Sequence, residues 1–155
     1  MDHNSVEILL VEDNVEDAEM TIRELKKHNM SNKVMHVQDG EQALNFIFCR
    51  GPFQDTREIS NTPRIILLDI KMPKVSGIEV LKQIRADDRT KSIPVVVLTS
   101  SKEDPDISVC YGLGVNSYIV KPVDFENFAT SIKNIGYYWL LLNEPPVNGK
   151  NISSY

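Results

Sequence analysis

The sequence predicts a doubly wound α/β fold: a five-stranded parallel sheet in the order 2-1-3-4-5, flanked by five helices. Two observations lead to this prediction. Short β-branched runs alternate strictly with segments whose apolar residues recur every three or four positions, and turn-forming residues separate the two kinds of segment. Such alternation favours a parallel sheet with helices on both faces. The 155 residues are sufficient for one domain with its own core.

The first part of the chain carries two predicted strands and two predicted helices. Val6–Val11 is almost wholly apolar, as expected for a central strand that is covered on both faces. Asp13-Asn14 can cap the next helix, whose apolar residues lie at helical spacing: Ala18, Ile22 and Leu25. The shorter, more polar Lys33–Val37 suits a sheet edge. Gly40 leads into a helix, and residues 49–63 form a loop longer than a compact α/β unit needs.

Two further strands and the helix between them follow. Arg64–Asp69 is the third predicted strand, and a loop with Met72-Pro73 comes after it. A helix is expected over Gly77–Arg85, because three apolar residues recur there at spacings of three: Ile78, Leu81 and Ile84. Pro94 then opens the fourth strand, Val95–Leu98.

The last predicted strand lies between two helices. Asp104-Pro105 is expected to start the fourth helix, because the missing N–H of proline is harmless in a first turn. Gly112 and Gly114 end that helix, and the fifth strand runs over Ser117–Val120. Asp124 is expected to cap the fifth helix.

The end of the fifth helix is apolar on more than one side. One stripe at helical spacing faces the core: Phe125, Phe128, Ile132, Ile135, Trp139 and Leu142. Four further residues lie off that stripe and are candidates for a homodimer or kinase interface: Tyr137, Tyr138, Leu140 and Leu141. We predict one domain over residues 5–143 and a mobile tail over residues 144–155, with no effector domain.

Composition excludes several classes of protein. The formal net charge of −5 argues against a nucleic-acid-binding protein, which usually presents a basic face. No apolar stretch approaches the ~20 residues that span a bilayer, and Met1–Ser5 lacks the basic and apolar regions of a signal peptide. Cys49 and Cys110 are too few for a disulfide framework and lack the spacing of a zinc site. We therefore expect reduced cysteines in a cytoplasmic protein that has no membrane partner.

Polar residues end four of the apolar runs. Glu12-Asp13 follow the first strand, Asp69 ends the third, Thr99 ends the fourth, and Lys121-Pro122 follow the fifth. Because ligands bind beyond the carboxyl ends of parallel strands, these side chains are expected to meet at one edge of the sheet. No histidine is expected near this crevice, since His3, His28 and His36 fall elsewhere in the predicted fold.

This set of side chains suits phosphoryl transfer. A carboxylate such as Asp69 can attack phosphorus and form an acyl phosphate, but the attack of one anion on another needs cations. An oxygen-rich cluster favours Mg²⁺, with Asp13 and Asp69 as ligands, Glu12 as a direct or water-mediated ligand, and the Lys71 carbonyl as a further oxygen. Lys121 would act as a second cation, and the Thr99 hydroxyl would reach a phosphoryl oxygen.

Four short motifs resemble the receiver domain of bacterial two-component response regulators. They stand in the expected order at the ends of the expected strands: Val11-Glu12-Asp13-Asn14, Asp69-Ile70-Lys71-Met72-Pro73, Thr99-Ser100 and Tyr118-Ile119-Val120-Lys121-Pro122. The resemblance covers residues 5 to about 135. It implies that Asp69 accepts a phosphoryl group from a histidine kinase and that Glu12 and Asp13 bind Mg²⁺. It also implies that Thr99 and Tyr118 form a switch pair, in which the tyrosine ring moves inward.

The long loop at residues 49–63 and the aromatic, leucine-rich end of the last helix resemble the phytochrome-associated branch of single-domain receivers of cyanobacteria. The resemblance implies a protein that is not an enzyme and that signals through phosphorylation-dependent protein contacts, with a phytochrome as a candidate kinase. Three alternatives remain. An aspartate-nucleophile phosphatase of the haloacid dehalogenase type would need an acid where Lys71 stands. A flavodoxin-like FMN module would need a phosphate loop without Glu12-Asp13. A degenerate receiver would fold but never be phosphorylated.

Overall fold

The predicted sheet is present, with the predicted strand order. The computed structural model describes residues 3, 6–28, 33–101 and 103–134. Within them, five parallel strands pair in the order β2-β1-β3-β4-β5. The strands are β1 (Ile8–Val11), β2 (Val34–Val37), β3 (Ile65–Asp69), β4 (Val95–Thr99) and β5 (Ser117–Val120). β1 begins at Ile8, two residues later than predicted, and β4 includes Thr99.

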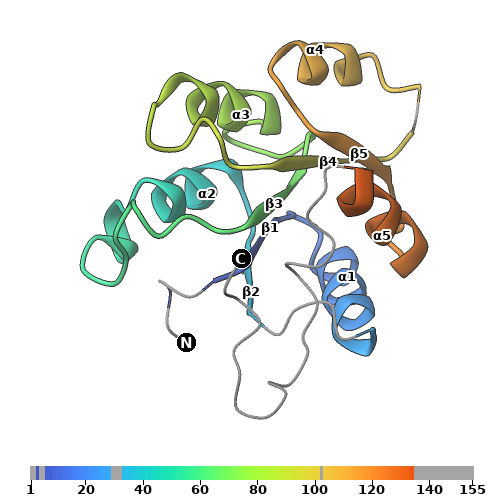
Figure 1. The fold of residues 1–155 in the computed structure, drawn as a ribbon, viewed down its shortest axis with the longest axis horizontal. Coiled ribbons are helices and arrows are strands. Elements are labelled where there is room, and N and C mark those ends of the chain that lie inside the picture. Colours follow the sequence, from blue (N-terminus) through green and yellow to red (C-terminus); the bar gives the residue numbers. More distant parts are fainter. Residues whose placement is uncertain (1–2, 4–5, 29–32, 102, 135–155) are drawn as a thin grey trace.

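Helices cover both faces of this sheet, as the α/β prediction requires. They are α1 (Val15–Lys27), α2 (Gly40–Ile47), α3 (Gly77–Ala86), α4 (Asp106–Gly112) and α5 (Phe125–Asn134), and a short 3₁₀ helix η2 (Gly51–Phe53) follows α2. Figure 1 shows α1 and α5 together on one side of the sheet and α2 and α3 on the other. The two faces have separate apolar clusters.

The apolar residues of each strand alternate between these two clusters, because successive side chains of a strand point to opposite faces. One cluster joins alternate strand residues to α1 and α5, with Ala18, Leu25 and Phe128 among its buried members. The other joins the remaining strand residues to α2, α3 and α4, and includes Phe46 and Leu81. β1, β3 and β4 are therefore buried on both faces, which explains their continuous apolar runs.

Side chains cap the helices at the edge where the strands end. Asn14 accepts from the backbone N–H of Asp17 at 2.9 Å, and Asp124 accepts from the N–H of Asn127 at 2.8 Å, as predicted. α3 begins so close to β3 that a Cβ on Gly77 would lie 2.2 Å from the Asp69 carbonyl oxygen. A glycine is therefore required where α3 packs on the backbone of Asp69.

The loop at residues 49–63 contains η2 and is held by one buried side chain. Arg57 is 5 % exposed, and its guanidinium donates to the carbonyl oxygens of Phe46 and Asn61, the latter at 2.7 Å. The same group stacks over the Phe46 ring, 4.2 Å from its centroid. Arg57 thus ties the loop to the carboxyl end of α2, where the helix leaves carbonyl groups unpaired.

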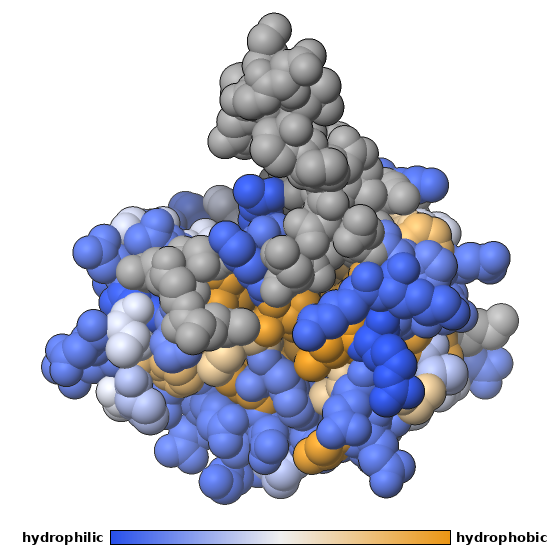
Figure 2. All heavy atoms as spheres, turned by 90° about the horizontal axis from the view of Figure 1, so that it is seen from below, coloured by the Kyte–Doolittle hydropathy of each residue, from blue (hydrophilic) through white to orange (hydrophobic). Residues whose placement is uncertain are grey.

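The surface carries many charged side chains. Figure 2 shows a largely hydrophilic face of the molecule, with apolar atoms gathered toward its middle. Among the described residues, no helix is both long enough and apolar enough to cross a membrane. α5 is described only to Asn134, so the predicted interface residues lie outside the described part of the chain, as does the predicted tail. Cys49 and Cys110 are both free thiols.

Candidate functional site

The polar residues at the strand ends meet in one pocket, at the edge that the sequence predicts. The pocket has a volume of about 190 Å³. Its lining residues come from the ends of β3 and β4, from the loops after β1, β3, β4 and β5, and from the first turn of α1: Asp13, Asn14, Asp17, Asp69, Ile70, Lys71, Leu98, Thr99, Ser100, Asp104 and Lys121. The carboxyl ends of neighbouring parallel strands make this convergence unavoidable, because the paired registers bring their last residues side by side.

Three carboxylates lie together at the centre of this edge. One oxygen each of Glu12, Asp13 and Asp69 lies within 4.8 Å of the other two. Glu12 and Asp69 are buried and Asp13 is exposed. Burial, followed by the neighbouring Glu12 carboxylate, raises the pKa of Asp69 to about 8. Such a cluster is a site for a cation, because a bound cation would offset the repulsion among the carboxylates.

Lys121 supplies the one ammonium group that contacts several of these carboxylates in the described structure. Its Nζ lies 3.1 Å from Glu12 Oε1, 3.4 Å from Asp17 Oδ2 and 3.6 Å from Asp69 Oδ2. Burial would lower the pKa of Lys121, but the carboxylates of Asp69, Glu12 and Asp17 outweigh it and raise that pKa. The ammonium is therefore charged and shared among several anions. The peptide bond that follows, between Lys121 and Pro122, is cis.

Strand alternation separates the site into two groups of side chains. Glu12, Asp69 and Lys121 each follow by two positions a residue of the α1–α5 cluster: Leu10, Leu67 and Ile119. Thr99 follows Val97 by two positions, and Val97 belongs to the cluster on the opposite face. The Glu12 and Asp69 carboxylates and Lys121 therefore share one face, and Thr99 faces the side of α3 and α4.

On that second side, Thr99 contacts a buried aspartate. The hydroxyl of Thr99 donates to the Ser101 carbonyl oxygen at 2.9 Å or to Asp104 Oδ2 at 3.3 Å. The ammonium of Lys71 lies 3.5 Å from the same Asp104 oxygen. The N–H of Asp106 lowers the pKa of Asp104 against the effect of burial, and Lys71 and Thr99 lower it further.

Three residues of this region were not predicted as parts of the site. Asp104 was expected only as part of a helix start, and Asp17 was not named in the sequence analysis. The expectation that no histidine lies near the crevice is wrong for His36, whose Nε2 lies 2.7 Å from the Glu12 carbonyl oxygen. Because a carbonyl only accepts, this nitrogen carries the proton. For Asp104, the sequence contained a usable signal. The loop after β4 starts at the same edge of the sheet as Thr99, so the aspartate expected at the end of that loop had to lie near the site.

The predicted switch residue Tyr118 does not line the pocket. The Tyr118 ring makes an edge contact with the Tyr111 ring, with centroids 6.2 Å apart. Tyr118 is partly buried against the α2–α3–α4 side of the core. The role of the Lys71 carbonyl as a metal ligand stays a prediction. The roles of the other predicted residues also stay predictions.

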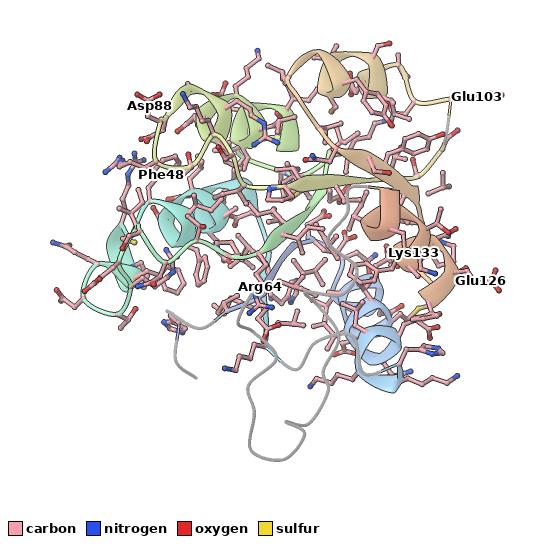
Figure 3. All side chains as sticks on the ribbon, in the orientation of Figure 1. Phe48, Arg64, Asp88, Glu103, Glu126 and Lys133 are labelled. Carbon is pink, nitrogen blue, oxygen red and sulfur yellow. The ribbon has the colours of Figure 1, made fainter. Side chains whose placement is uncertain are left out.

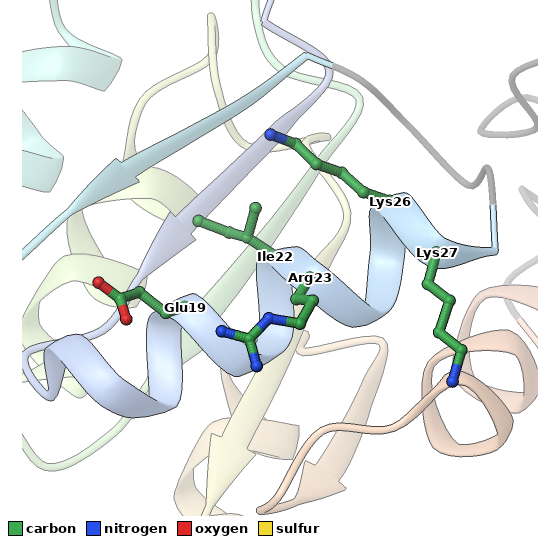
Figure 4. A pocket seen from close by; sticks show the side chains of 5 residues that line it. All are labelled: Glu19, Ile22, Arg23, Lys26 and Lys27. Atoms are coloured by element: carbon green, nitrogen blue, oxygen red, sulfur yellow. The ribbon is translucent and has the colours of Figure 1, made fainter.

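A larger hollow, of about 590 Å³, lies along α1. Figure 4 shows its lining side chains, which all come from this one helix: Glu19, Ile22, Arg23, Lys26 and Lys27. Four of these five side chains are charged. In the smaller pocket, by contrast, acidic and basic groups come together from the ends of different strands. Chemistry therefore assigns the functional site to the smaller pocket.

The smaller pocket is suited to phosphoryl transfer. It combines a buried carboxylate, an acidic cluster that fits a divalent cation, a shared ammonium and a hydroxyl. These groups position and neutralise a transferring phosphoryl group. Neither the phosphatase nor the FMN module fits as well. The Lys71 ammonium pairs with Asp104 where a phosphatase of the haloacid dehalogenase type needs an acid, and the carboxylates would repel a phosphate of FMN.

The chain is similar to known proteins over most of its length. Residues 8–133 match the family described as "Response regulator receiver domain". The chain is 35% identical over 133 residues to "Response regulator Rcp1" of Synechocystis sp., covering 86% of this chain and 88% of that protein. It is 40% identical over 139 residues to the "Probable methanogenesis regulatory protein FilR2" of Methanothrix harundinacea, covering 90% of this chain and 86% of that protein.

Solved structures agree with these matches. The "Bacteriophytochrome response regulator RtBRR" aligns with a TM-score of 0.81 and 48% identity, over 91% of this chain and 84% of that one. A "Mn(2+)-bound form" of Rcp1 aligns with a TM-score of 0.69 and 33% identity, over 90% of this chain and 98% of that one. The acidic cluster of this chain and the metal in that title point to the same property, a divalent-cation site.

Proposed function

Because the chain belongs to the response regulator receiver domain family, we propose that Asp69 accepts a phosphoryl group from a sensor histidine kinase. The phosphorylated protein then signals through contacts with other proteins. One observation carries the proposal: the buried Asp69 carboxylate lies 3.6 Å from the Lys121 ammonium and within 4.8 Å of the Glu12 and Asp13 carboxylates. The proposed nucleophile, Asp69, thus lies next to both a cationic side chain and the carboxylates that could bind a metal.

In the proposed reaction, an Asp69 oxygen attacks phosphorus, the bond from phosphorus to the donor nitrogen breaks, and an acyl phosphate forms. The Lys121 ammonium already contacts the Asp69 carboxylate, and it would form an ion pair with the phosphoryl oxygens once the phosphoryl group is on Asp69. Thr99 would donate its hydroxyl to one of those oxygens. Each of these groups stabilises the transferring group and none becomes covalently modified except Asp69.

We propose Mg²⁺ as the cation. Glu12, Asp13 and Asp69 offer carboxylate oxygens, which are the ligands that this hard cation prefers, and the Lys71 carbonyl would add another. Mg²⁺ would supply positive charge to the phosphoryl oxygens during transfer.

The experiment is intact mass spectrometry after incubation with acetyl phosphate and MgCl₂. Wild type should gain one phosphoryl group, whereas Asp69→Asn should gain none and a chelator should abolish the gain. Asp124→Asn is the matched control, because Asp124 caps α5 at 2.8 Å from the Asn127 N–H and does not line the pocket. An adduct on Asp69→Asn would mean that another residue accepts the phosphoryl group, and no adduct on wild type would support the degenerate alternative.

We further propose a kinase of the bacteriophytochrome class, on the strength of the 48% identity to the bacteriophytochrome response regulator. To test this choice of kinase, the rates of phosphotransfer to Asp69 are measured with a bacteriophytochrome kinase and with an unrelated histidine kinase. Phosphotransfer to Asp69 should be much faster from the former; equal rates would contradict this choice of partner. A cytoplasmic location fits the two free thiols.

A homodimer through the last helix is the final element of the proposal. It rests on the sequence alone, because Tyr137, Tyr138, Leu140 and Leu141 lie outside the described residues. These apolar side chains lie off the stripe that the core requires. The double variant Leu140→Asp with Leu141→Asp should elute as a monomer in size-exclusion chromatography, and elution identical to wild type would contradict the interface.

A further inference from the structure

Asp104 is a buried acidic residue that the proposed phosphoryl transfer does not use. Its side chain is 3 % exposed, whereas its neighbour Glu103 is exposed at the rim of the molecule (Figure 3). Carboxylates are rarely buried unless several partners compensate for the loss of water. The partners of Asp104 therefore indicate what its burial achieves.

The two oxygens of Asp104 have different partners. Oδ1 accepts from the backbone N–H of Asp106 at 2.9 Å, in the first turn of α4. Oδ2 lies 3.3 Å from the Thr99 hydroxyl and 3.5 Å from the Lys71 ammonium. A single carboxylate thus joins the loop after β3, the end of β4 and the start of α4.

These contacts compete with a phosphoryl group for the same donors. The Thr99 hydroxyl has one proton, which is engaged by the Ser101 carbonyl or by Asp104. A phosphoryl oxygen can receive that proton only if both acceptors lose it. The Lys71 ammonium lines the pocket beside Asp69, and its partner in the structure is Asp104. A doubly charged phosphoryl group on Asp69 would attract both donors more strongly than one carboxylate does.

We propose that Asp104 is a positioning residue that holds Thr99 and Lys71 in the unphosphorylated arrangement and releases them when Asp69 is phosphorylated. Because Asp104 also binds the first turn of α4, the release changes the contacts of that helix with the site. The inference rests on the proposed function of Asp69 and assigns a regulatory role to a residue outside the carboxylate cluster.

The thermodynamic consequence has a definite sign. Contacts that exist in only one of two states shift the equilibrium toward that state. The Asp104 contacts stabilise the unphosphorylated arrangement, so their removal should favour the phosphorylated one. A variant that loses them should bind a phosphoryl mimic more tightly than wild type.

Asp104→Asn separates this role from helix capping. The amide oxygen can still accept from the Asp106 N–H, and the opposite orientation would face two donors toward each other. The amide nitrogen then replaces Oδ2, and it cannot accept from Thr99 or Lys71. Asp104→Ser is a second variant, because serine also caps helices but its single hydroxyl cannot serve both partners. Both variants therefore keep the start of α4.

The measurement is the affinity for beryllofluoride in MgCl₂, determined by calorimetry on the whole chain. Both Asp104 variants should bind roughly 3- to 10-fold more tightly than wild type, as expected when one charge-assisted contact is lost from the competing state. Glu103→Gln is the control for lost charge and Asp124→Asn the control for a changed cap, and both should bind like wild type. In a Thr99→Ala background, Asp104→Asn should give a clearly smaller gain.

A second readout follows the ligand-free protein. In Asp104→Asn, the backbone amide signals of Thr99 and Asp106 should move toward their positions in beryllofluoride-bound wild type, a change that mere loss of stability would not produce. If both Asp104 variants bind beryllofluoride as wild type does, or more weakly, the inference is overturned. Binding of beryllofluoride by wild type would still support the proposed function in that case. If wild type itself fails to bind beryllofluoride, the proposed function fails, and this inference fails with it.

Discussion

At the scale of single residues, Asp69 is placed where its own charge is unfavourable. It is 4 % exposed and lies beside the buried Glu12 carboxylate, with Lys121 as the ammonium that contacts both. A protein under pressure only for stability would place an uncharged side chain here. The position makes sense for a nucleophile that a cation must activate.

The pH dependence of stability should report this placement. A carboxyl whose folded pKa is raised stabilises the fold at low pH, and that stabilisation is lost as pH rises from about 4 through about 8. In a metal-free buffer, Asp69→Asn should therefore be more stable than wild type at pH 8, by roughly 1–3 kcal/mol. The difference should shrink steadily toward pH 4, as measured by urea unfolding with a chelator.

Asp124→Asn is the control for that series, since Asp124 is exposed and remote from the carboxylates. Its stability relative to wild type should not show the same rise between pH 4 and pH 8. If Asp69→Asn is less stable than wild type at pH 8, the site is organised around a favourable charge and the assignment of the raised pKa is wrong.

Gly77 illustrates a backbone requirement of the same site. A Cβ at this position would lie 2.2 Å from the Asp69 carbonyl oxygen and 2.8 Å from Ile70 Cα, so the backbone of Asp69 would have to move. Gly77→Ala should lower the free energy of unfolding by about 1–3 kcal/mol and slow phosphorylation from acetyl phosphate. Gly112→Ala is the matched control, because no atom lies within 4 Å of its Cβ position in α4. That variant should keep its phosphorylation rate and gain up to about 1 kcal/mol.

An equal gain of stability in both glycine variants would mean that helix propensity, and not the contact with Asp69, governs position 77. Normal phosphorylation of a destabilised Gly77→Ala would show that the nucleophile tolerates a shift of its backbone.

At the scale of elements, the long loop between α2 and β3 depends on Arg57. The guanidinium contacts the Phe46 and Asn61 carbonyl oxygens and the Cys49 sulfur, the last at 3.2 Å. Arg57→Leu removes the guanidinium donor from the Phe46 and Asn61 carbonyl oxygens, and we expect a loss of about 2–4 kcal/mol in chemical unfolding. Phosphorylation of Asp69 should remain, because this loop precedes β3 and so lies at the opposite edge of the sheet.

The comparison variant is Arg50→Leu. Arg50 belongs to the same loop but is exposed, and its guanidinium contacts the Phe48 ring, 4.9 Å from the centroid. Its removal should change stability by less than about 1 kcal/mol. Similar losses in the two variants would refute the central role of Arg57 in this loop.

The elements themselves were largely predictable, for physical reasons that apply to each. β1, β3 and β4 are covered on both faces, so their sequences are continuous apolar runs, and the polar residue that ends each run had to lie at the common edge. Asn14 and Asp124 were recognisable as caps because their side chains satisfy N–H groups within three residues. Local rules were sufficient wherever the partner was close in sequence.

The rest depended on contacts between distant loops, which no period or cap signals. Asp104 contacts Lys71 across 33 positions of sequence and His36 contacts the Glu12 carbonyl across 24. Arg57 is a charged residue in a segment without periodicity, yet it is buried. Each of these positions is determined by side-chain packing between loops, so the sequence predicted the location of the site but not its full membership.

At the scale of the whole molecule, stability and cation binding should be linked. A cation that binds only the folded chain stabilises it by about 2.7 kcal/mol at a concentration 100 times its dissociation constant. For a domain of this size each kcal/mol raises Tm by roughly 2–4 °C. MgCl₂ should therefore raise Tm by several degrees over NaCl of equal ionic strength, a comparison that removes general screening of the net charge of −5.

The size of that increase should depend on pH, because Mg²⁺ and a proton compete for the same Asp69 carboxylate. We expect a larger increase at pH 8 than at pH 6. Asp13→Asn removes the exposed carboxylate of the cluster and should lose most of the increase, whereas Asp124→Asn should keep it. A full increase in Asp13→Asn would place the cation elsewhere on the acidic surface. An increase that is independent of pH would mean that the cation binds without displacing a proton from Asp69. Cation binding and the ionisation of Asp69 would then be independent of each other.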